Sequence, residues 1–262
     1  MKITIIGAGA MGGTTAEGLL KQKKIDVALT VSDPVKSTRE RFEQLGATTT
    51  DDNAAAAKGA DVVFVVVKPW LVEQVLKGIA PVLTGRQALV VVAAGVASAK
   101  IREWLADSVF AKTKGALLLA IPNIAIAQLA SMTFLVPVVA DDTQTAVVKG
   151  LFDSVGTTLL TDEQHLPAGT TLASCGLAYA LRYIRAASEG GVELGFRADD
   201  AKTIVAQTLL GAVRFLQATG MHPEQAIDLV TTPGGLTIKG LNEMEHAGFT
   251  SAVVRGLKAG LK

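Results

Sequence analysis

The first 33 residues carry the feature that most constrains the fold of this chain. The apolar run Lys2–Ile6 stops at the segment Gly-Ala-Gly-Ala-Met-Gly, which occupies positions 7–12. A helical stretch over residues 11–24 and a second strand over residues 27–31 follow, and Asp33 stands just beyond them. This order of elements is the dinucleotide-binding fingerprint. It consists of a strand, a glycine turn, a helix, a second strand and an acid about 20 residues past the glycines.

Each glycine of this segment has a separate physical role. Gly7 permits the sharp turn out of the strand, Gly9 lets the backbone approach a pyrophosphate, and Gly12 allows the helix to pack closely on the sheet. The N–H groups and the positive dipole end at the start of the helix attract phosphate. A lone G-x-G-x-x-G also occurs in purely structural turns, so the prediction depends on the strand–helix–strand context. That context predicts a cofactor site that includes Ala10 and Met11 as well as the three glycines.

Short apolar strands alternate with helices over the first 160 residues. The uninterrupted apolar runs at residues 62–67 and 88–92 are typical of parallel strands that are covered on both faces. Further strands are expected near residues 47–49, 116–119, 133–139 and 157–160, and the direction of the later ones is left open. The pattern predicts an α/β fold that begins with a doubly wound Rossmann domain at residues 1–160.

Three short segments follow predicted strands at the edge where such a sheet binds its ligand, the carboxyl end of the strands. They are Lys68-Pro69, Ala93-Ala94-Gly95 and Pro122-Asn123. We expect these segments to lie next to the bound cofactor.

From residue 161 onward the pattern becomes helical. Helices are expected over residues 172–192, 199–219, 223–230, 237–247 and 250–261. Hydrophobic residues make up 49% of the chain, yet no window reaches the roughly 18 uninterrupted apolar residues of a membrane-spanning helix. This excess of apolar residues indicates a large subunit interface. Residues 161–262 are therefore predicted to form an all-helical domain that binds substrate and carries the subunit contact.

Charge and cysteine content narrow the function classes. A formal net charge of +1 gives no electrostatic reason to expect nucleic acid or an anionic membrane as a partner. The single cysteine, Cys175, rules out an intrachain disulfide, and His165, His222 and His246 lack the spacing of metal ligands. We therefore expect no metal. The chain opens on a strand without a leader pattern, and a cytoplasmic enzyme is expected.

Several further blocks accompany the N-terminal fingerprint. They are residues 5–12 (IIGAGAMG), 65–69 (VVVKP), 93–96 (AAGV), 121–123 (IPN), 211–212 (GA), 219–223 (TGMHP) and 230–241 (VTTPGGLTIKGL). Across nearly the whole chain these blocks resemble the pyrroline-5-carboxylate reductase family, whose members reduce a cyclic imino acid to proline. The last block is the most specific, because a Pro-Gly-Gly-x-Thr segment at this distance from a glycine fingerprint is much rarer than either motif alone.

The resemblance implies a role for individual positions on the cofactor side. Residues 7–12 would hold the pyrophosphate, and Asn123 would lie near the nicotinamide and the substrate. The adenosine ribose would be held by Ser32, Asp33, Lys36 and Asn53, the cleft would be lined by Val67, Lys68 and Pro69, and the nicotinamide would be flanked by Ala93, Ala94 and Gly95.

On the substrate side the resemblance implies that Gly234, Gly235 and Thr237 bind the imino acid, from one subunit or its partner. The Pro-Gly-Gly segment breaks one helix, and the free N–H groups at the start of the next suit a carboxylate. The Thr237 hydroxyl can hydrogen-bond the imine nitrogen, which needs a proton as hydride reaches the adjacent carbon. Thr237 and Asn123 are therefore the expected catalytic residues. The alternative is that Thr237 is simply an N-cap.

The chain departs from the family pattern at the start of the first long helix. A Ser-Gly-Ser-Gly-Pro-Ala-Tyr segment is expected there, and residues 173–179 read Ala-Ser-Cys-Gly-Leu-Ala-Tyr instead. Ile124-Ala125 stands where Thr-Pro is usual, and Leu236 stands where a small or hydroxyl residue is usual. These changes make the substrate side, including Cys175, more apolar. A core thiol is the alternative reading of Cys175.

The sequence leaves two questions open: which nicotinamide cofactor is used and which class of reaction is catalysed. Asp33 favours the ribose hydroxyls of NADH, whereas the cluster Lys36–Arg39 offers a phosphate site, and NADPH is slightly favoured. The expected function is reduction of 1-pyrroline-5-carboxylate to L-proline by a homodimer or a larger assembly of dimers. A related hydroxyacid dehydrogenase is the first alternative, although residues 172–192 lack the lysine of that class. The second is a cofactor-binding regulatory relative without turnover.

Overall fold

The computed structural model describes residues 1–261, and the chain divides into two compact units. The first unit comprises Met1–Ser174 and the second begins at Cys175. The boundary expected after residue 160 falls at the end of the last strand, whereas the first unit continues through the short helical segments that follow. None of the helices among the described residues is long and apolar enough to cross a membrane.

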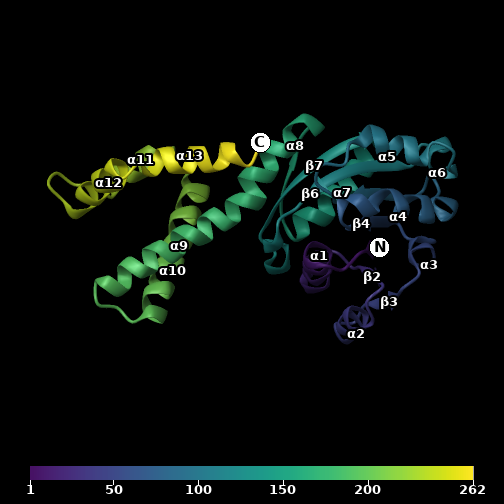
Figure 1. Cartoon of the computed structure of the whole chain (residues 1–262), viewed down its shortest axis with the longest axis horizontal. Helices are drawn as coiled ribbons and strands as arrows, with labels where there is room; N and C mark the ends of the chain where they lie inside the picture. The colour runs from purple at the N-terminus through teal and green to yellow at the C-terminus, as the bar shows by residue number, and fades with distance from the viewer. Residues whose placement is uncertain (262) are drawn as a thin grey trace. The chain divides into compact units, whose positions relative to one another are not determined.

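The first unit is built on an eight-stranded sheet with the order β3-β2-β1-β4-β5-β6-β7-β8 (Figure 1). The strands are β1 (Lys2–Ile6), β2 (Ala28–Ser32), β3 (Thr48–Thr50), β4 (Val62–Val65), β5 (Ala88–Val91), β6 (Ala116–Ile121), β7 (Ser131–Val139) and β8 (Gly156–Leu160). Neighbours from β3 through β6 pair in parallel, β7 runs antiparallel to β6, and β8 is parallel to β7. The predicted doubly wound sheet is confirmed, and the chain reverses its winding between β1 and β4.

Helices cover both faces of this sheet. They are α1 (Ala10–Lys21), α2 (Lys36–Gln44), α3 (Asn53–Ala57), α4 (Val72–Ile79), α5 (Ser98–Leu105), α6 (Val109–Lys112), α7 (Asp142–Ser154) and α8 (Leu166–Gly169). Shorter helical turns are η1 (Pro69–Leu71), η2 (Ala80–Val82), η3 (Ile124–Gln128), η4 (Glu163–His165) and η5 (Thr170–Cys175).

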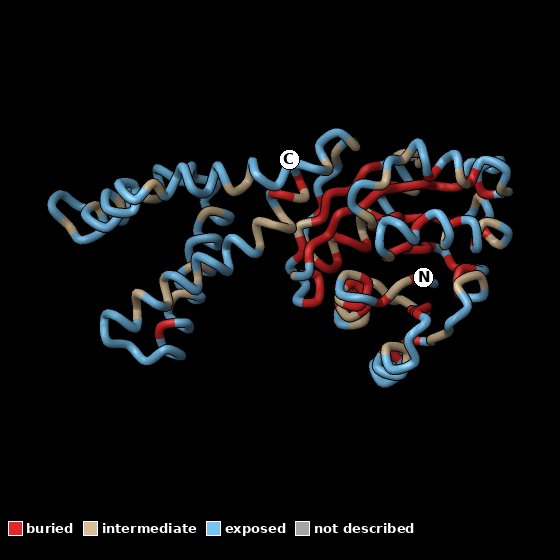
Figure 2. Tube along the Cα trace, in the orientation of Figure 1, coloured by how far each residue is buried: buried red, intermediate tan, exposed pale blue. Residues whose placement is uncertain are grey.

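Alternate residues of each central strand enter two separate cores. In β4, Phe64 joins the core under α1, α2 and α7, while Val63 and Val65 join the core under α4, α5 and α6. The Phe64 ring meets the Phe152 ring of α7 edge to face, with centroids 5.6 Å apart. Burial on both faces explains why these strands read as continuous apolar runs. In Figure 2 the buried segments gather on the strands of this unit.

The second unit is entirely helical, as predicted. Its helices are α9 (Gly176–Glu193), α10 (Ala198–Thr219), α11 (Pro223–Leu229), α12 (Leu236–His246) and α13 (Phe249–Ala259). A β-carbon on Gly191 would lie 2.9 Å from the Ala201 β-carbon, so α9 and α10 approach closely at this point. Helix α13 contacts α9 through the Phe249 and Tyr183 rings, whose centroids are 6.4 Å apart. Ala201 is the one buried residue among the described residues of this unit.

Candidate functional site

The three glycines of the fingerprint differ in what surrounds them. A β-carbon on Gly7 would lie 2.5 Å from the Val66 carbonyl oxygen, and one on Gly12 would lie 1.9 Å from the Gly7 carbonyl oxygen. No atom lies within 4 Å of the same position on Gly9. Gly7 has a φ of +88°, a conformation that favours glycine. Gly7 and Gly12 are therefore required by close packing, whereas Gly9 faces open space.

Helix α1 begins directly after this open position. Its N-cap is Gly9, which has no side chain to bond the first-turn N–H groups, and the first turn contains no acidic residue. Unsatisfied N–H groups at a helix start bind phosphate oxygens. The exposed Ala10 and half-buried Met11 stand at this start. The arrangement fits the pyrophosphate of a dinucleotide.

The end of β2 lies beside the glycine loop. The Gly7 N–H donates to the Ser32 carbonyl oxygen at 2.8 Å, and the Ser32 hydroxyl donates to Asn53 Oδ1 at 2.7 Å. Asp33 is only 8% exposed, and its carboxylate accepts hydrogen bonds from the Ala8 N–H at 2.8 Å and the Val35 N–H at 2.9 Å. The expected ribose-side residues Ser32, Asp33 and Asn53 are thus gathered at one place, with Asp33 turned toward the backbone.

Two basic side chains follow β2. Arg39 Nη1 donates to the carbonyl oxygens of Asp33 and Pro34 at 2.8 and 3.0 Å, and its side chain is 18% exposed. The Lys36 side chain is 81% exposed, and its ammonium lies 3.6 Å from Glu40. Sequence reasoning included Arg39 only as part of a basic cluster. Its position, six residues after Asp33 at the end of β2, is the feature of the sequence that could have identified Arg39 individually.

The segments after β4 and β5 complete this edge of the sheet. The Val66 N–H donates to the Ile6 carbonyl oxygen at 2.8 Å, and a Val67 methyl would lie 2.7 Å from a β-carbon on Gly7. Lys68 and Pro69 are exposed beside them. After β5, which neighbours β4, the segment Ala93-Ala94-Gly95 forms an open turn in which Gly95 has a φ of +78°. The predicted cofactor-lining segments therefore share the carboxyl edge of adjacent parallel strands.

Asn123 follows β6 and is only 7% exposed. Its Oδ1 accepts from the Ala125 N–H at 3.1 Å, and its Nδ2 donates to the Ala173 carbonyl oxygen at 3.3 Å. The Ser174 hydroxyl donates to the Pro122 carbonyl oxygen at 3.4 Å. Asn123 thus joins the end of β6 to η5, which is a π-helical turn, a feature that is frequent at functional sites. Cys175 ends this turn as a half-buried free thiol.

In the second unit the Pro-Gly-Gly segment forms the start of α12. Gly234 has a φ of +70°, the Gly235 N–H donates to the Thr232 carbonyl oxygen at 2.9 Å, and Gly235 is the N-cap of the helix. Thr237 is therefore not the N-cap. It is exposed, and its hydroxyl has no hydrogen-bond partner among residues 1–261. The helix start offers free N–H groups and a free hydroxyl side by side.

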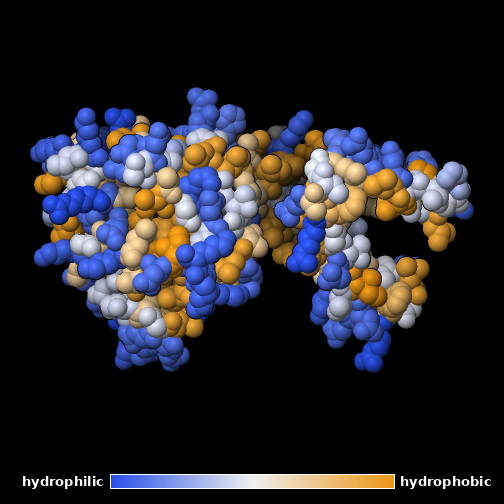
Figure 3. Space-filling view, turned by 180° about the vertical axis from the view of Figure 1, so that it is seen from behind, coloured by the Kyte–Doolittle hydropathy of each residue, from blue (hydrophilic) through white to orange (hydrophobic). Residues whose placement is uncertain are grey.

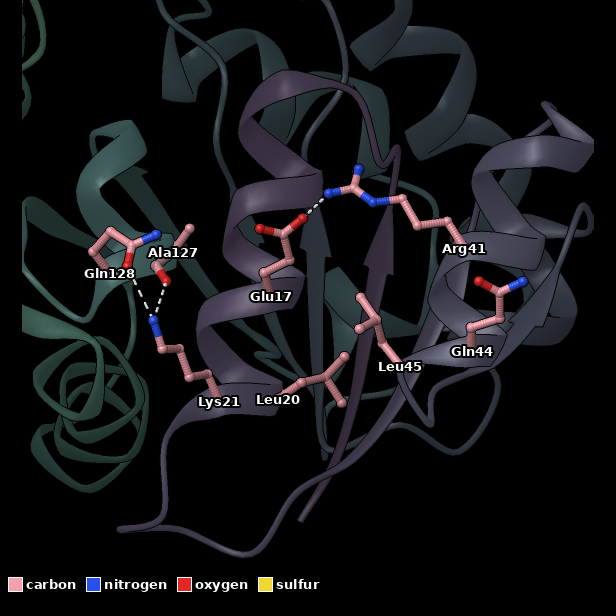
Figure 4. Close-up of a pocket in the computed structure, with 8 residues that line it drawn as sticks. All are labelled: Glu17, Leu20, Lys21, Arg41, Gln44, Leu45, Ala127 and Gln128. Atoms are coloured by element: carbon pink, nitrogen blue, oxygen red, sulfur yellow. Dashed lines mark hydrogen bonds and ion pairs between the residues drawn. The ribbon is translucent and has the colours of Figure 1, made fainter.

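A surface cavity of about 520 Å³ lies elsewhere on the first unit (Figure 4). It is lined by Glu17, Leu20, Lys21, Arg41, Gln44, Leu45, Ala127 and Gln128. Its polar groups bond one another, through an Arg41–Glu17 ion pair and a 3.0 Å hydrogen bond from Lys21 Nζ to Gln128 Oε1. Lys21 ends α1, roughly 15 Å from the glycine loop at a rise of 1.5 Å per residue. None of the predicted site residues lines this cavity.

The resolved pKa shifts lie outside the predicted site. Hydrogen bonds from the side chain and backbone of His165 hold the pKa of Asp162 below its ordinary value. Burial raises the pKa of Asp153, but the hydrogen bonds from Lys149 and Thr158 outweigh it and leave that pKa lowered. These two carboxylates belong to the supporting structure.

Comparison with known proteins identifies the family. A family model described as pyrroline-5-carboxylate reductase dimerisation matches residues 163–262, and one described as NADP oxidoreductase, coenzyme F420-dependent, matches residues 2–95. Pyrroline-5-carboxylate reductase 2 of Dictyostelium discoideum is 33% identical over 97% of this chain and 89% of its own length. Reductase 1 of the same organism is 35% identical over 97% of this chain, which spans 48% of that longer relative.

A solved structure agrees with these relatives. The 1-pyrroline-5-carboxylate reductase of Streptococcus pyogenes superposes with a TM-score of 0.84 at 30% identity, covering 100% of this chain and 96% of its own. The sequence relatives and this structure span both units of the chain. The chain belongs to the pyrroline-5-carboxylate reductase family.

Proposed function

We propose that this protein reduces the C=N bond of 1-pyrroline-5-carboxylate to give L-proline, with NADPH as the preferred reductant. Family membership supports this reaction over that of a hydroxyacid dehydrogenase. The observation that carries the chemistry is the start of α12. There an exposed Thr237 hydroxyl, which has no hydrogen-bond partner within residues 1–261, stands beside first-turn N–H groups that the N-cap does not satisfy.

The first unit holds the cofactor in this proposal. The N–H groups at the start of α1 bind the pyrophosphate, and Gly9 leaves the space that the phosphates need. Ser32 and Asn53 face the adenosine ribose, Lys68 and Pro69 line the cleft, and residues 93–95 flank the nicotinamide. When bound, the reduced nicotinamide supplies a hydride to the imine carbon.

The preference for NADPH is supported by the groups at the end of β2. Both carboxylate oxygens of Asp33 accept backbone N–H groups, and the residue is 8% exposed. The carboxylate is therefore not free to select the two ribose hydroxyls of NADH. Lys36 and Arg39 supply positive charge at the same place, which suits a 2′-phosphate.

The second unit holds the imino acid. The substrate carboxylate accepts hydrogen bonds from the first-turn N–H groups of α12, which follow Gly234 and Gly235, and Thr237 hydrogen-bonds the imine nitrogen. As the carbon of the C=N bond receives hydride, the nitrogen takes a proton that Thr237 relays from solvent. Asn123 fixes the backbone on the nicotinamide side, and Cys175 contributes an apolar wall to the substrate pocket. The start of α12 comes from the same subunit or from its partner.

A homodimer formed through the helical unit completes the proposal. A single buried residue, Ala201, is too little to offset the conformational entropy lost on ordering the described helices of this unit. Large apolar side chains are exposed on its helices, for example Leu210, Val213 and Phe215 of α10. Figure 3 shows apolar side chains on the surface of these helices. Assembly into more than a dimer and a cytoplasmic location stay predictions.

A direct assay tests the proposal. The purified protein is given NADPH or NADH with a panel of cyclic imino acids, and NADP+ or NAD+ with a panel of 2-hydroxy acids, and nicotinamide absorbance is followed. We expect oxidation of NADPH with 1-pyrroline-5-carboxylate, appearance of proline, and no reaction with the 2-hydroxy acids in the reverse direction. Tight NADPH binding without turnover on any imine would instead support the regulatory alternative.

A further inference from the structure

The carboxylate of Asp33 joins two loops that are separate in sequence. One oxygen accepts from the Ala8 N–H at 2.8 Å, in the glycine loop. The other accepts from the Val35 N–H at 2.9 Å, at the residue that precedes α2. A carboxylate that accepts two backbone N–H groups makes strong, charge-assisted hydrogen bonds. The contact therefore couples the position of the glycine loop to the turn after β2.

The main-chain groups of Asp33 are also engaged. Its N–H donates to the Thr50 carbonyl oxygen at 3.1 Å, and its own carbonyl oxygen accepts from Arg39 Nη1 at 2.8 Å. The residue is 8% exposed. If the carboxylate turned outward to a ribose, the buried Ala8 N–H would lose its partner, and an unpaired buried donor is unfavourable.

We propose that Asp33 is a positioning residue for the pyrophosphate-binding loop and does not recognise the ribose. The bond to Ala8 holds the glycine loop one residue before the open position at Gly9, where the phosphates approach. Because the pyrophosphate is common to NADPH and NADH, the contribution of Asp33 is the same for both cofactors. This inference rests on the proposed cofactor of the first unit.

Ribose recognition and loop positioning predict different effects of Asp33 on the choice between NADPH and NADH. An acid that accepts the two ribose hydroxyls favours NADH and repels the 2′-phosphate of NADPH. Its removal weakens NADH binding alone and leaves NADPH binding equal or stronger. An acid that positions the loop contributes equally to both cofactors, so its removal weakens both by a common factor. The ratio of the two dissociation constants therefore distinguishes the roles.

The chain provides a matched control. Asp61 Oδ2 accepts from the Lys2 N–H at 2.7 Å, so an acid makes the same kind of bond at the opposite end of β1. Asp61→Asn replaces a charged acceptor of a backbone N–H with a neutral amide oxygen, far from the glycine loop. It reports any general loss of stability without a change at the cofactor site.

The test is fluorescence titration of NADPH and NADH into the full-length protein and its Asp33→Asn, Asp33→Ser and Asp61→Asn variants. We expect both Asp33 variants to weaken both cofactors by a similar factor of about ten, typical of a lost hydrogen bond to a charged group. Asp61→Asn should leave both dissociation constants unchanged. In steady state, KM for the cofactor should rise while kcat at saturating cofactor stays constant.

Two results would overturn the proposal. One is an effect confined to a single cofactor, which indicates contact with the ribose or its 2′-phosphate. The other is unchanged binding of both cofactors in variants that circular dichroism shows to be folded. Because binding is measured without turnover, this test keeps its meaning if no cyclic imine proves to be a substrate.

Discussion

Glu163 caps the helix that follows the loop at residues 93–97: its carboxylate accepts the Ser98 N–H at 2.8 Å and also bonds the Ser98 hydroxyl. Ser98 is the first residue of α5, and Ala97, its N-cap, provides no side-chain bond. Glu163 opens η4, directly after the last strand region. A distant acid thus takes the place of a local cap and ties the chain after β8 to the loop at residues 93–97.

Glu163→Ala should lower the free energy of unfolding by about 1–2 kcal/mol, the usual cost of a lost helix cap. Because the loop at residues 93–95 loses its support, KM for the cofactor should also rise. Chemical denaturation and steady-state kinetics measure the two effects. The control is Glu73→Ala, which breaks an exposed ion pair with Lys77 and should change stability by less than about 0.5 kcal/mol. Equal behaviour of the two variants would contradict the capping role.

Thr237→Ala should reduce kcat by roughly tenfold or more, because the hydroxyl proposed to relay a proton to the imine nitrogen is lost. Thr237→Ser keeps the hydroxyl and should retain most of the activity. Thr203 of α10 donates to the Asp199 carbonyl oxygen, so Thr203→Ala is a threonine control outside the site. Stopped-flow turnover at saturating NADPH separates a change in kcat from one in binding. Full activity of Thr237→Ala would exclude the relay.

The sequence pattern is sufficient to predict the eight strands and the five helices of the second unit, and the buried strands are predicted from their apolar runs. Continuous apolar runs such as Val62–Val65 arise from burial on both faces, which sequence patterns record directly. The orientation of Asp33 was not predictable. Motif spacing places an acid at the end of β2, but whether its carboxylate faces solvent or the Ala8 N–H depends on tertiary contacts. The same limit applies to Glu163, whose partner Ser98 lies 65 residues away.

The boundary between the units also shows the limit of local patterns. The last strand ends at Leu160, and the sequence changes character there. The first unit nevertheless extends to Ser174. The Asn123 side-chain amide donates to the Ala173 carbonyl oxygen, and the Ser174 hydroxyl donates to the Pro122 carbonyl oxygen. Such bonds join segments about 50 residues apart in sequence, and local hydrophobic periodicity carries no information about them.

Lys36→Ala and Arg39→Ala should each weaken NADPH more than NADH, because both remove positive charge at the proposed 2′-phosphate position. The Lys36 side chain is 81% exposed, so its loss should leave stability unchanged. Arg39→Ala should be slightly less stable, since Arg39 bonds the Asp33 and Pro34 carbonyl oxygens. The ratio of kcat/KM for the two cofactors is the measurement, with Lys23→Ala as the exposed-lysine control. An unchanged ratio in both variants would remove the support for NADPH preference.

The double change Leu210→Glu and Val213→Glu should dissociate the proposed dimer. These side chains lie three residues apart on α10 and are 42% and 51% exposed in the single chain. Burying two carboxylates in an apolar interface is strongly unfavourable. Sedimentation velocity should show a monomer, and circular dichroism should show reduced helicity. Val147→Glu, on an exposed apolar position of α7, should leave the assembly unchanged. A dimer that survives the double change would place the subunit contact elsewhere.

Gly9→Ala and Gly12→Ala should separate binding from folding within one loop. A β-carbon on Gly9 meets no atom within 4 Å, and its φ of −65° is one that alanine adopts readily. The variant should therefore fold with wild-type stability yet bind NADPH at least about tenfold more weakly, because the methyl group enters the space proposed for the phosphates. A β-carbon on Gly12 would lie 1.9 Å from the Gly7 carbonyl oxygen. That overlap should lower the free energy of unfolding by about 2–3 kcal/mol. Thermal unfolding with and without NADPH measures both effects. If NADPH stabilises the Gly9→Ala protein as much as it stabilises the wild type, the phosphates bind elsewhere.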